Sequence, residues 1–288
     1  MKNISLWLLV ALIWGSSFAA IKIGVESIAP MALVAGRMII ASIVLLVILK
    51  MKSLSLPKDL RAWAIFLVVG LSGNVIPFYL ISYGEIEVGS GLAALLMSIT
   101  PIATVFIAPL ILFEEKYNIR STFGIILGVV GVIILVGVDA IFGIGENLTS
   151  QIAIISAALL YAFTTIFVKR FVTQKPIVMA TGSILAGTII ITLIVLILDH
   201  PASYMLPKMN SFIAMIYLGI FPTAIATLFY FYLVPRIGAS RMSQINFLVP
   251  VVGAFIGVFF LGETLGSSAI YALVIILFAI YLVSSGRK

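Results

Sequence analysis

Long apolar runs, separated by charged residues, glycine and proline, divide the sequence into ten hydrophobic segments. They lie near residues 4–25, 31–50, 62–83, 89–112, 121–138, 150–171, 178–198, 209–233, 242–261 and 267–284. Each is close to the roughly 20 residues that an α-helix needs to cross the hydrocarbon core of a bilayer. The runs are continuous rather than alternating, which disfavours the strands of a membrane β-barrel. The pattern therefore predicts an all-α integral membrane protein with ten transmembrane helices.

The composition supports this prediction and excludes several other classes of protein. Apolar residues make up 63% of the chain and charged residues 9%, against about 25% charged residues in ordinary soluble domains. Mean hydropathy is +1.30, so neither a soluble enzyme nor a disordered chain fits. The chain has no cysteine and a single histidine, His200. We therefore expect no disulfide, no metal site and no cofactor.

The basic residues are unevenly distributed between the two sides of the ten predicted spans. Fourteen of the 17 Lys and Arg residues fall on the side of the N-terminus, and Lys208 alone lies in a loop on the other side. Lys22 and Arg37 lie within spans, near that second side. The positive-inside rule then places both termini in the cytoplasm, and we expect a bacterial inner-membrane location. The net charge of +7 is explained by this distribution, and no nucleic-acid partner is expected.

The second half of the sequence repeats the first at an offset of 149 residues. The matching pairs include Gly70 with Gly219, Tyr83 with Tyr232, Gly89 with Gly238, Pro101 with Pro250 and Glu114 with Glu263. We assign residues 1–145 to a first five-helix repeat and residues 146–288 to a second. Because five is odd, the second repeat enters the membrane upside down. Inverted repeats are typical of secondary transporters that work by alternating access, and duplication for packing alone is the alternative.

Short motifs at matching places in the two halves resemble those of a known family. The first span reads Leu12-Ile13-Trp14-Gly15-Ser16-Ser17-Phe18, the fourth carries Thr100-Pro101 and ends with Phe113-Glu114-Glu115, and the ninth carries Pro250 and ends with Leu261-Gly262-Glu263. Over essentially its whole length, the chain resembles EamA-type members of the drug/metabolite transporter superfamily. That resemblance implies ten helices in two inverted five-helix repeats around a central cavity. The subgroup it looks most like exports aromatic and other neutral amino acids from bacteria.

No Asp or Glu lies near the middle of a predicted span. Proton-driven and sodium-driven carriers usually place such a group in the transport path, so we expect a facilitative uniporter that works by alternating access. The alternative is a proton-coupled multidrug or other metabolite exporter in which Glu114 or Glu263 titrates at a span end. A membrane-embedded enzyme is disfavoured, because no nucleophile, base and orienting group converge.

Neutral hydrogen-bonding and aromatic side chains within the spans are the candidates for lining a substrate cavity. They are Trp14, Ser17, Asn74, Phe78, Tyr79, Tyr83, Tyr161, Thr164, Thr223, Thr227, Gln244 and Asn246. Such groups suit a neutral or aromatic amino acid, since rings stack on its side chain and amides hold its ammonium and carboxylate. The alternative for each Ser and Thr is a bond to its own or a neighbouring helix. Tyr83, near a span end, has the alternative of an interface anchor.

Two cations and two prolines complete the set of candidates. Arg37 lies roughly 9 Å inside its span. It either pairs with Glu26, snorkels outward, or, together with Lys22, contacts a substrate carboxylate or phosphate. Pro101 and Pro250 are predicted hinges.

A glycine stripe in the fifth predicted span leaves the oligomeric state open. Gly124, Gly128 and Gly131 would permit close helix approach, either inside one chain or across a dimer. We expect a monomer in the lipid bilayer, with a homodimer as the alternative.

Overall fold

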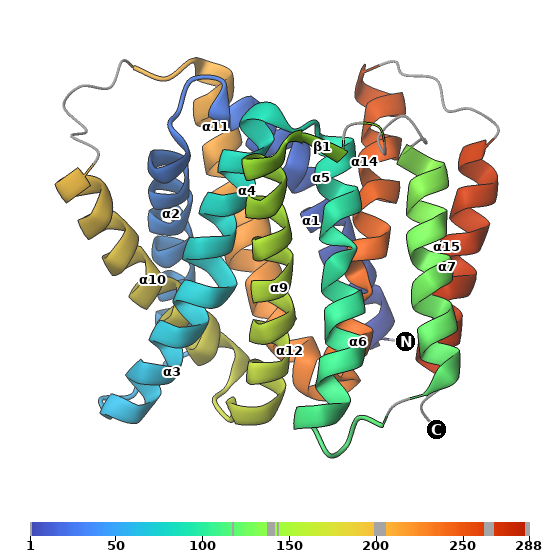
Figure 1. Ribbon diagram of the computed structural model, residues 1–288. Coiled ribbons are helices and arrows are strands. Elements are labelled where there is room, and N and C mark those ends of the chain that lie inside the picture. The colour runs from blue at the N-terminus through green and yellow to red at the C-terminus, as the bar shows by residue number, and fades with distance from the viewer. Residues whose placement is uncertain are drawn as a thin grey trace.

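The computed structural model describes residues 2–116, 118–136, 142, 144–198, 206–261 and 268–285, and it is a bundle of helices (Figure 1). Seven helical stretches are long and apolar enough to cross a membrane: Asn3–Val25, Pro30–Met51, Leu60–Glu87, Gly91–Ile111, Leu148–Phe171, Pro176–Leu198 and Met209–Ile237. Shorter apolar helices lie at Ile119–Leu135 and Ile270–Val283. The predicted all-helical membrane architecture is confirmed at this level, while the count of ten spans stays a prediction.

Every predicted span coincides with one helix or with a series of consecutive helices. The first half contains α1 (Lys2–Val25), α2 (Pro30–Met51), α3 (Leu60–Gly70), η1 (Leu71–Val75), α4 (Ile76–Glu87), α5 (Ser90–Met97), α6 (Ile99–Ile111) and α7 (Ile119–Val136). A short strand, β1 (Ile144–Asn147), precedes the second half. The second half contains α9 (Leu148–Phe171), α10 (Pro176–Leu198), α11 (Met209–Leu218), η3 (Gly219–Ile225), α12 (Ala226–Ile237), α13 (Ala239–Ser243), α14 (Ile245–Leu261) and α15 (Ser268–Ser285).

Local sequence accounts for several of the helix ends. Pro30 and Pro176 are the first residues of α2 and α10, where the missing N–H of proline costs no helical hydrogen bond. Asp59 caps α3 by accepting from the backbone N of Ala62 at 2.8 Å. Lys169 is among the basic residues of the last turn of α9, where positive charge complements the helix dipole.

Two of the long helical stretches contain a π-helical segment at matching places. The segment η1 precedes Pro77, and η3 contains Pro222. Because proline has no backbone N–H, it interrupts the regular helical hydrogen bonding, and a π segment accommodates the interruption. Each of these two stretches thus contains a helix irregularity next to a proline.

Two apolar runs that the sequence presents as single spans are divided in the structure. The run at 89–112 forms α5 and α6, separated at Ser98, and the run at 242–261 forms α13 and α14, separated at Gln244. The first division lies three residues before Pro101, which is in the first turn of α6, and the second lies six residues before Pro250, which is inside α14. The two prolines predicted as hinges therefore follow the divisions at different distances.

The helices of the two halves pack on one another in reciprocal pairs. Helix α2 packs on α10, and α7 packs on α15. Helix α1 contacts α12 and α14, and α9 correspondingly contacts α4 and α6. This is the arrangement that a duplicated chain produces when equivalent helices meet, and the inverted relation of the repeats remains a prediction.

The glycine stripe of α7 lies against α14 and α15 within the same chain. A Cβ atom at Gly124 would come within 2.7 Å of Val283, one at Gly128 within 2.7 Å of Phe247, and one at Gly131 within 2.7 Å of Ile276. The stripe therefore serves close packing inside the bundle, which was the first of its two predicted uses.

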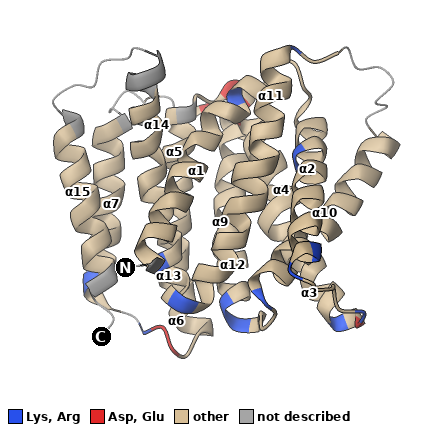
Figure 2. Ribbon diagram, turned by 180° about the vertical axis from the view of Figure 1, so that it is seen from behind, with Lys and Arg blue, Asp and Glu red and all other residues tan. Residues whose placement is uncertain are grey.

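Charged residues gather at the two ends of the bundle (Figure 2). Lys and Arg are concentrated at the end toward which both termini lie, and Asp and Glu are seen at both ends (Figure 2). The distribution of the basic residues agrees with the one expected for ten spans. The cytoplasmic location of the termini follows from the positive-inside rule and stays a prediction.

Candidate functional site

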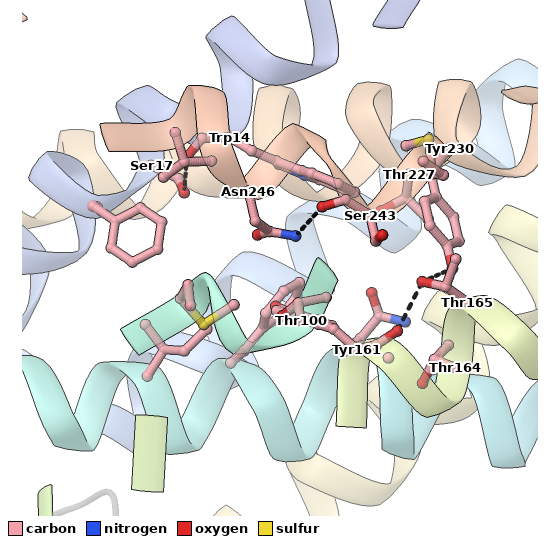
Figure 3. Close-up of a pocket in the computed structure, with 18 of the residues that line it drawn as sticks. Trp14, Ser17, Thr100, Tyr161, Thr164, Thr165, Thr227, Tyr230, Ser243 and Asn246 are labelled. Atoms are coloured by element: carbon pink, nitrogen blue, oxygen red, sulfur yellow. Dashed lines mark hydrogen bonds between the residues drawn. The ribbon is translucent and has the colours of Figure 1, made fainter. Parts of the chain in front are cut away.

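A cavity lies inside the bundle where helices of both halves meet, as Figure 3 shows. Its walls come from α1, α2, α3, η1, α4, α5 and α6 of the first half and from α9, α12, α13 and α14 of the second. The polar and aromatic residues lining it are Trp14, Ser17, Phe18, Arg37, Asn74, Phe78, Thr100, Tyr161, Thr164, Thr165, Thr227, Tyr230, Phe231, Ser243 and Asn246. Apolar lining residues include Ile21, Val69, Met97, Met242 and Val249.

Hydrogen bonds hold several of the polar side chains in place around the cavity. Asn246 donates through its amide nitrogen to the carbonyl of Ser243 at 3.0 Å, and Asn74 donates to Val69 O at 3.4 Å. The hydroxyl of Tyr230 donates to Thr165 Oγ1 at 3.0 Å, and that threonine donates onward to a backbone carbonyl in α9. One N–H of each asparagine amide is thus bonded to the protein, and the amide oxygens of the two asparagines can serve as neutral acceptors.

Aromatic rings form the other part of the cavity wall. Trp14 lies 5.9 Å from Tyr230 between ring centroids, and its indole Nε1 donates to Pro222 O at 3.2 Å. Trp14 therefore links α1 to the π-helical segment η3 of the other half. The predicted position of this tryptophan on the cavity wall agrees with the structure.

Arg37 projects into this cavity from α2 and is 2% exposed. Its Nε donates to Thr223 Oγ1 at 2.9 Å, and its guanidinium carbon lies 3.9 Å from the centroid of the Phe78 ring. The predicted pairing with Glu26 is wrong, because Glu26 pairs with Lys208 at 3.9 Å instead. Outward snorkelling is also wrong, since the side chain is buried between η3 and α4.

The acidic residues lie around the ends of the helices and outside the cavity wall. Glu114 is exposed and pairs with Lys169 at 3.1 Å. Glu115 is buried and accepts from the backbone N of Ala239 at 2.6 Å and from Ser240. Glu85 is fully buried, and neither of its carboxylate oxygens has a hydrogen-bond partner among the described residues. Glu263 lies outside the described residues.

Comparison with protein families identifies the class of protein that carries this cavity. The sequence model of the EamA-like transporter family matches residues 1–137 and again residues 148–285. The chain belongs to the EamA-like transporter family. The predicted family resemblance is confirmed, and each of the two matches covers one half of this EamA-like transporter.

Individual relatives support a multi-pass membrane transporter. The uncharacterized inner membrane transporter YedA of Escherichia coli (strain K12) is 29% identical over 279 residues, which cover 96% of this chain and 88% of YedA. An uncharacterized transporter of Archaeoglobus fulgidus is 27% identical over 294 residues, covering 98% of this chain and 99% of the relative. A crystal structure of another protein superposes with a TM-score of 0.80 at 18% identity. The superposition covers 98% of this chain and 96% of the other. This last similarity concerns the fold alone.

Eight of the twelve predicted cavity residues line the cavity of this transporter. They are Trp14, Ser17, Asn74, Phe78, Tyr161, Thr164, Thr227 and Asn246. Their position in the cavity wall makes them the first candidates for contact with a substrate.

Four predicted cavity residues have other neighbours. Tyr79 and Tyr83 stack on each other at 6.2 Å between centroids, and Tyr83 is 37% exposed, as its alternative role of interface anchor requires. Thr223 does not line the cavity, and its hydroxyl oxygen accepts the hydrogen bond from Arg37 Nε. Gln244 is buried at the division between α13 and α14 and donates to Ser240 O at 3.1 Å.

Lys22, the second predicted charge contact, has its own partners outside the cavity. Its Nζ lies 2.6 Å from Glu85 O and 3.3 Å from Ile86 O, both backbone carbonyls at the end of α4. Positive charge at a helix C-terminus is favourable, so the position of Lys22 has a structural explanation.

Four polar lining residues are not among the cavity residues predicted from the sequence: Thr100, Thr165, Tyr230 and Ser243. Tyr230 and Thr165 are 65 positions apart, and only the packing of α12 against α9 brings them together. Ser243 ends α13, where the helix divides. Helix periodicity could have indicated Thr227 and Tyr230 as neighbours on α12, but it contains no signal for which face meets the cavity.

Proposed function

We propose that this EamA-like transporter exports neutral amino acids, aromatic ones among them, and related small metabolites across the bacterial inner membrane. The observation that carries the proposal is the cavity between the two halves, which combines aromatic rings with neutral hydrogen-bonding groups. Rings such as Trp14, Tyr161 and Tyr230 offer faces for an aromatic side chain. Asn74 and Asn246 offer amide oxygens to an ammonium group.

Alternating access is the transport mechanism that we propose for this cavity. Both halves contribute to its wall, so a movement of one half relative to the other would change its access from one side to the other. The matched π-helical segments and the prolines after the helix divisions give each half sites at which a helix can bend. We propose a monomer in the bilayer as the working unit.

Facilitative transport is the form that the cavity chemistry favours. No Asp or Glu is among the residues that line the cavity in the described part of the chain. A site without a carboxylate has no acidic group that could exchange a proton, and it has no negatively charged ligand for a sodium ion. The substrate gradient would then be the driving force.

Proton coupling is the second candidate, and Glu85 is the residue that favours it. This carboxyl group is fully buried near the end of α4 and has no hydrogen-bond partner in the described structure. Lys22 and Arg37 are the cations that act on it electrostatically. Buried ionisable groups of this kind mark proton paths in other transporters. Glu85 therefore replaces Glu114, which is exposed and already paired, as the described carboxylate to test.

Efflux from proteoliposomes tests the proposed function. Vesicles containing the purified transporter would be loaded with labelled phenylalanine, threonine or glucose, with equal pH and equal salt on both sides. We expect both amino acids to leave and glucose to be retained. Retention of both amino acids under every gradient would overturn the substrate assignment. If efflux requires a proton gradient in the wild type and loses that requirement in Glu85→Gln, the second candidate replaces uniport.

Two tryptophans provide a matched pair of variants for this assay. Trp14→Phe and Trp63→Phe each remove one indole hydrogen bond to a backbone carbonyl, at 3.2 Å and 2.9 Å respectively, but only Trp14 lines the cavity. We expect Trp14→Phe to slow phenylalanine efflux about tenfold, the size of one hydrogen bond. Trp63→Phe should leave efflux unchanged. Equal effects of the two variants would contradict the assignment of this cavity to transport.

A further inference from the structure

Arg37 is a buried cation whose charge is not matched inside the described structure. Its Nε is bonded to Thr223 Oγ1 and one face of its guanidinium lies over Phe78. Its two terminal nitrogens make no hydrogen bond to any described residue, although the side chain is 2% exposed. Arg37 is among the residues that line the cavity, so a ligand inside the cavity can approach it.

None of the nearby described acids forms an ion pair with Arg37. Lys169 pairs with Glu114, and Lys208 pairs with Glu26. Glu85 acts on Arg37 electrostatically but does not come within ion-pair distance, and it is not part of the cavity wall. A buried cation without a counter-ion is costly, so an anion that enters the cavity gains most of its interaction energy here.

We propose that Arg37 binds the carboxylate of the substrate, so that transported solutes must carry a carboxylate while their ammonium group is dispensable. This inference rests on the proposed function, because it concerns the same cavity. Arginine presents its N–H groups as a planar fork that fits the two oxygens of a carboxylate. Thr223 accepts from Nε and Phe78 lies under the guanidinium, so the two contacts orient the fork and leave its terminal nitrogens for an incoming carboxylate.

The other end of an amino acid meets a different environment. The cavity wall contains no described acid, and the groups that can accept from an ammonium are neutral oxygens such as that of Asn246. Loss of the ammonium group therefore removes neutral hydrogen bonds, whereas loss of the carboxylate leaves a buried cation unpaired. The two functional groups of the same substrate should consequently have very unequal effects on binding.

The cations near the cavity also indicate how much negative charge the bound group carries. Lys22 is the other intramembrane cation predicted from the sequence, and its Nζ is committed to the carbonyls of Glu85 and Ile86. A single guanidinium balances one negative charge, so the site suits a carboxylate better than a doubly charged phosphate ester.

Calorimetric titration of the purified full-length protein in detergent tests this inference with four probes of similar shape. They are phenylalanine, 3-phenylpropionate, which lacks the ammonium, phenylalaninamide, which lacks the carboxylate, and phenyl phosphate. We expect 3-phenylpropionate to bind within about tenfold of phenylalanine. Phenylalaninamide should bind at least about 100-fold more weakly than phenylalanine, and phenyl phosphate no more tightly than 3-phenylpropionate.

Arg37→Gln and Lys22→Gln form the matched pair of variants. Arg37→Gln should weaken both carboxylates about 100-fold while leaving phenylalaninamide unchanged. Lys22→Gln should preserve the preference for carboxylates. Arg37→Lys, which keeps the charge and loses the fork, should retain part of that preference, and it serves in place of Arg37→Gln if that protein does not fold.

Several results would overturn the role of Arg37. They are binding of phenylalaninamide as tight as that of phenylalanine, failure of both carboxylates to bind, tighter binding of phenyl phosphate than of 3-phenylpropionate, and equal loss in the Arg37→Gln and Lys22→Gln variants. The proposed function fails separately: carboxylate binding through Arg37 without any amino-acid efflux would defeat export and leave the role of Arg37 standing.

Discussion

The π-helical segments η1 and η3 are built alike, but they have different neighbours. Asn74 in η1 donates to the carbonyl oxygen five residues earlier, that of Val69, at 3.4 Å. Thr223 in η3 does the same to Leu218 at 2.7 Å. In both segments a polar side chain thus satisfies a carbonyl near the helix irregularity, at positions related by the 149-residue offset.

The helices that pack beside the two segments carry different side chains at the point of closest approach. Gly70, next to η1, is approached by Ser183 of α10, and Gly219 of η3 is approached by Arg37 of α2. Ser183 bonds to its own helix at Ala180 O, whereas Arg37 bonds to Thr223 and lines the cavity. The comparison teaches that backbone packing is duplicated in this molecule and that the charge is placed on one side only. Residues for packing and residues for specificity can therefore be changed separately.

The largest expected effect comes from filling the two close backbone approaches. A Cβ atom at Gly70 would lie 2.4 Å from Ser183 O, and one at Gly219 would lie 2.7 Å from Ile40 and 2.9 Å from Arg37 O. We expect Gly70→Ala and Gly219→Ala each to lower the free energy of unfolding by about 1–3 kcal/mol. Thermal unfolding in detergent would measure this, with Gly70→Ala the more destabilised because it meets a rigid carbonyl directly.

Gly253→Ala is the control for these two variants. An added Cβ there meets nothing within 4 Å, so the substitution should not lower the melting temperature. If Gly70→Ala melts like Gly253→Ala, the close packing at η1 described above is incorrect.

The sequence predicts the helices well because their signal is local. Each apolar run ends at charges, proline or glycine, and the helix limits fall within a few residues of the predicted ones. The divisions at Ser98 and Gln244 were not predicted, since polar residues such as these also occur inside continuous membrane helices and do not by themselves mark a break. The use of Gly124, Gly128 and Gly131 for internal packing also depends on which helix lies opposite, which the sequence leaves open.

The candidate site was predictable in its residue types more than in its contacts. A membrane-embedded asparagine is costly enough to suggest a role by itself, and Asn74 and Asn246 do line the cavity. Arg37 shows the limit: its partner Thr223 is 186 positions away, so the choice between Glu26 and the cavity could only come from the packing of α2 on η3.

A smaller effect is expected when Arg37 loses the acceptor that orients it. Thr223→Val removes the hydroxyl that receives the Arg37 Nε hydrogen bond while keeping the shape of the side chain. We expect the affinity for phenylalanine to fall about tenfold, in keeping with one hydrogen bond to a charged group. The affinity for phenylalaninamide should not change, and titration calorimetry would give both values.

Thr223→Ser is the rescue variant, because it restores the hydroxyl. A role of Thr223 in packing alone predicts equal losses for phenylalanine and phenylalaninamide. Equal losses would mean that η3 has no part in substrate selection. The two π-helical segments would then be alike in function as well as in geometry.

The smallest expected effect concerns the predicted hinges, Pro101 and Pro250, which are equivalent in sequence but not in the structure. Pro101 is the third residue of α6, where the first backbone N–H groups of a helix have no partner within it. Pro250 lies inside α14, where an ordinary residue would donate to the carbonyl of Asn246, a residue of the cavity wall. Pro250→Ala therefore adds a hydrogen bond next to the cavity, and Pro101→Ala adds none.

We accordingly expect Pro250→Ala to slow phenylalanine efflux several-fold and Pro101→Ala to slow it less, with the melting temperatures of both proteins close to that of the wild type. Efflux from proteoliposomes at matched protein density would measure the difference. Unchanged efflux in both variants would show that neither proline acts as a hinge in transport. A stronger effect of Pro101→Ala would mean that bending occurs at the division between α5 and α6, and that the missing hydrogen bond at Pro250 has only a local consequence for the backbone of Asn246.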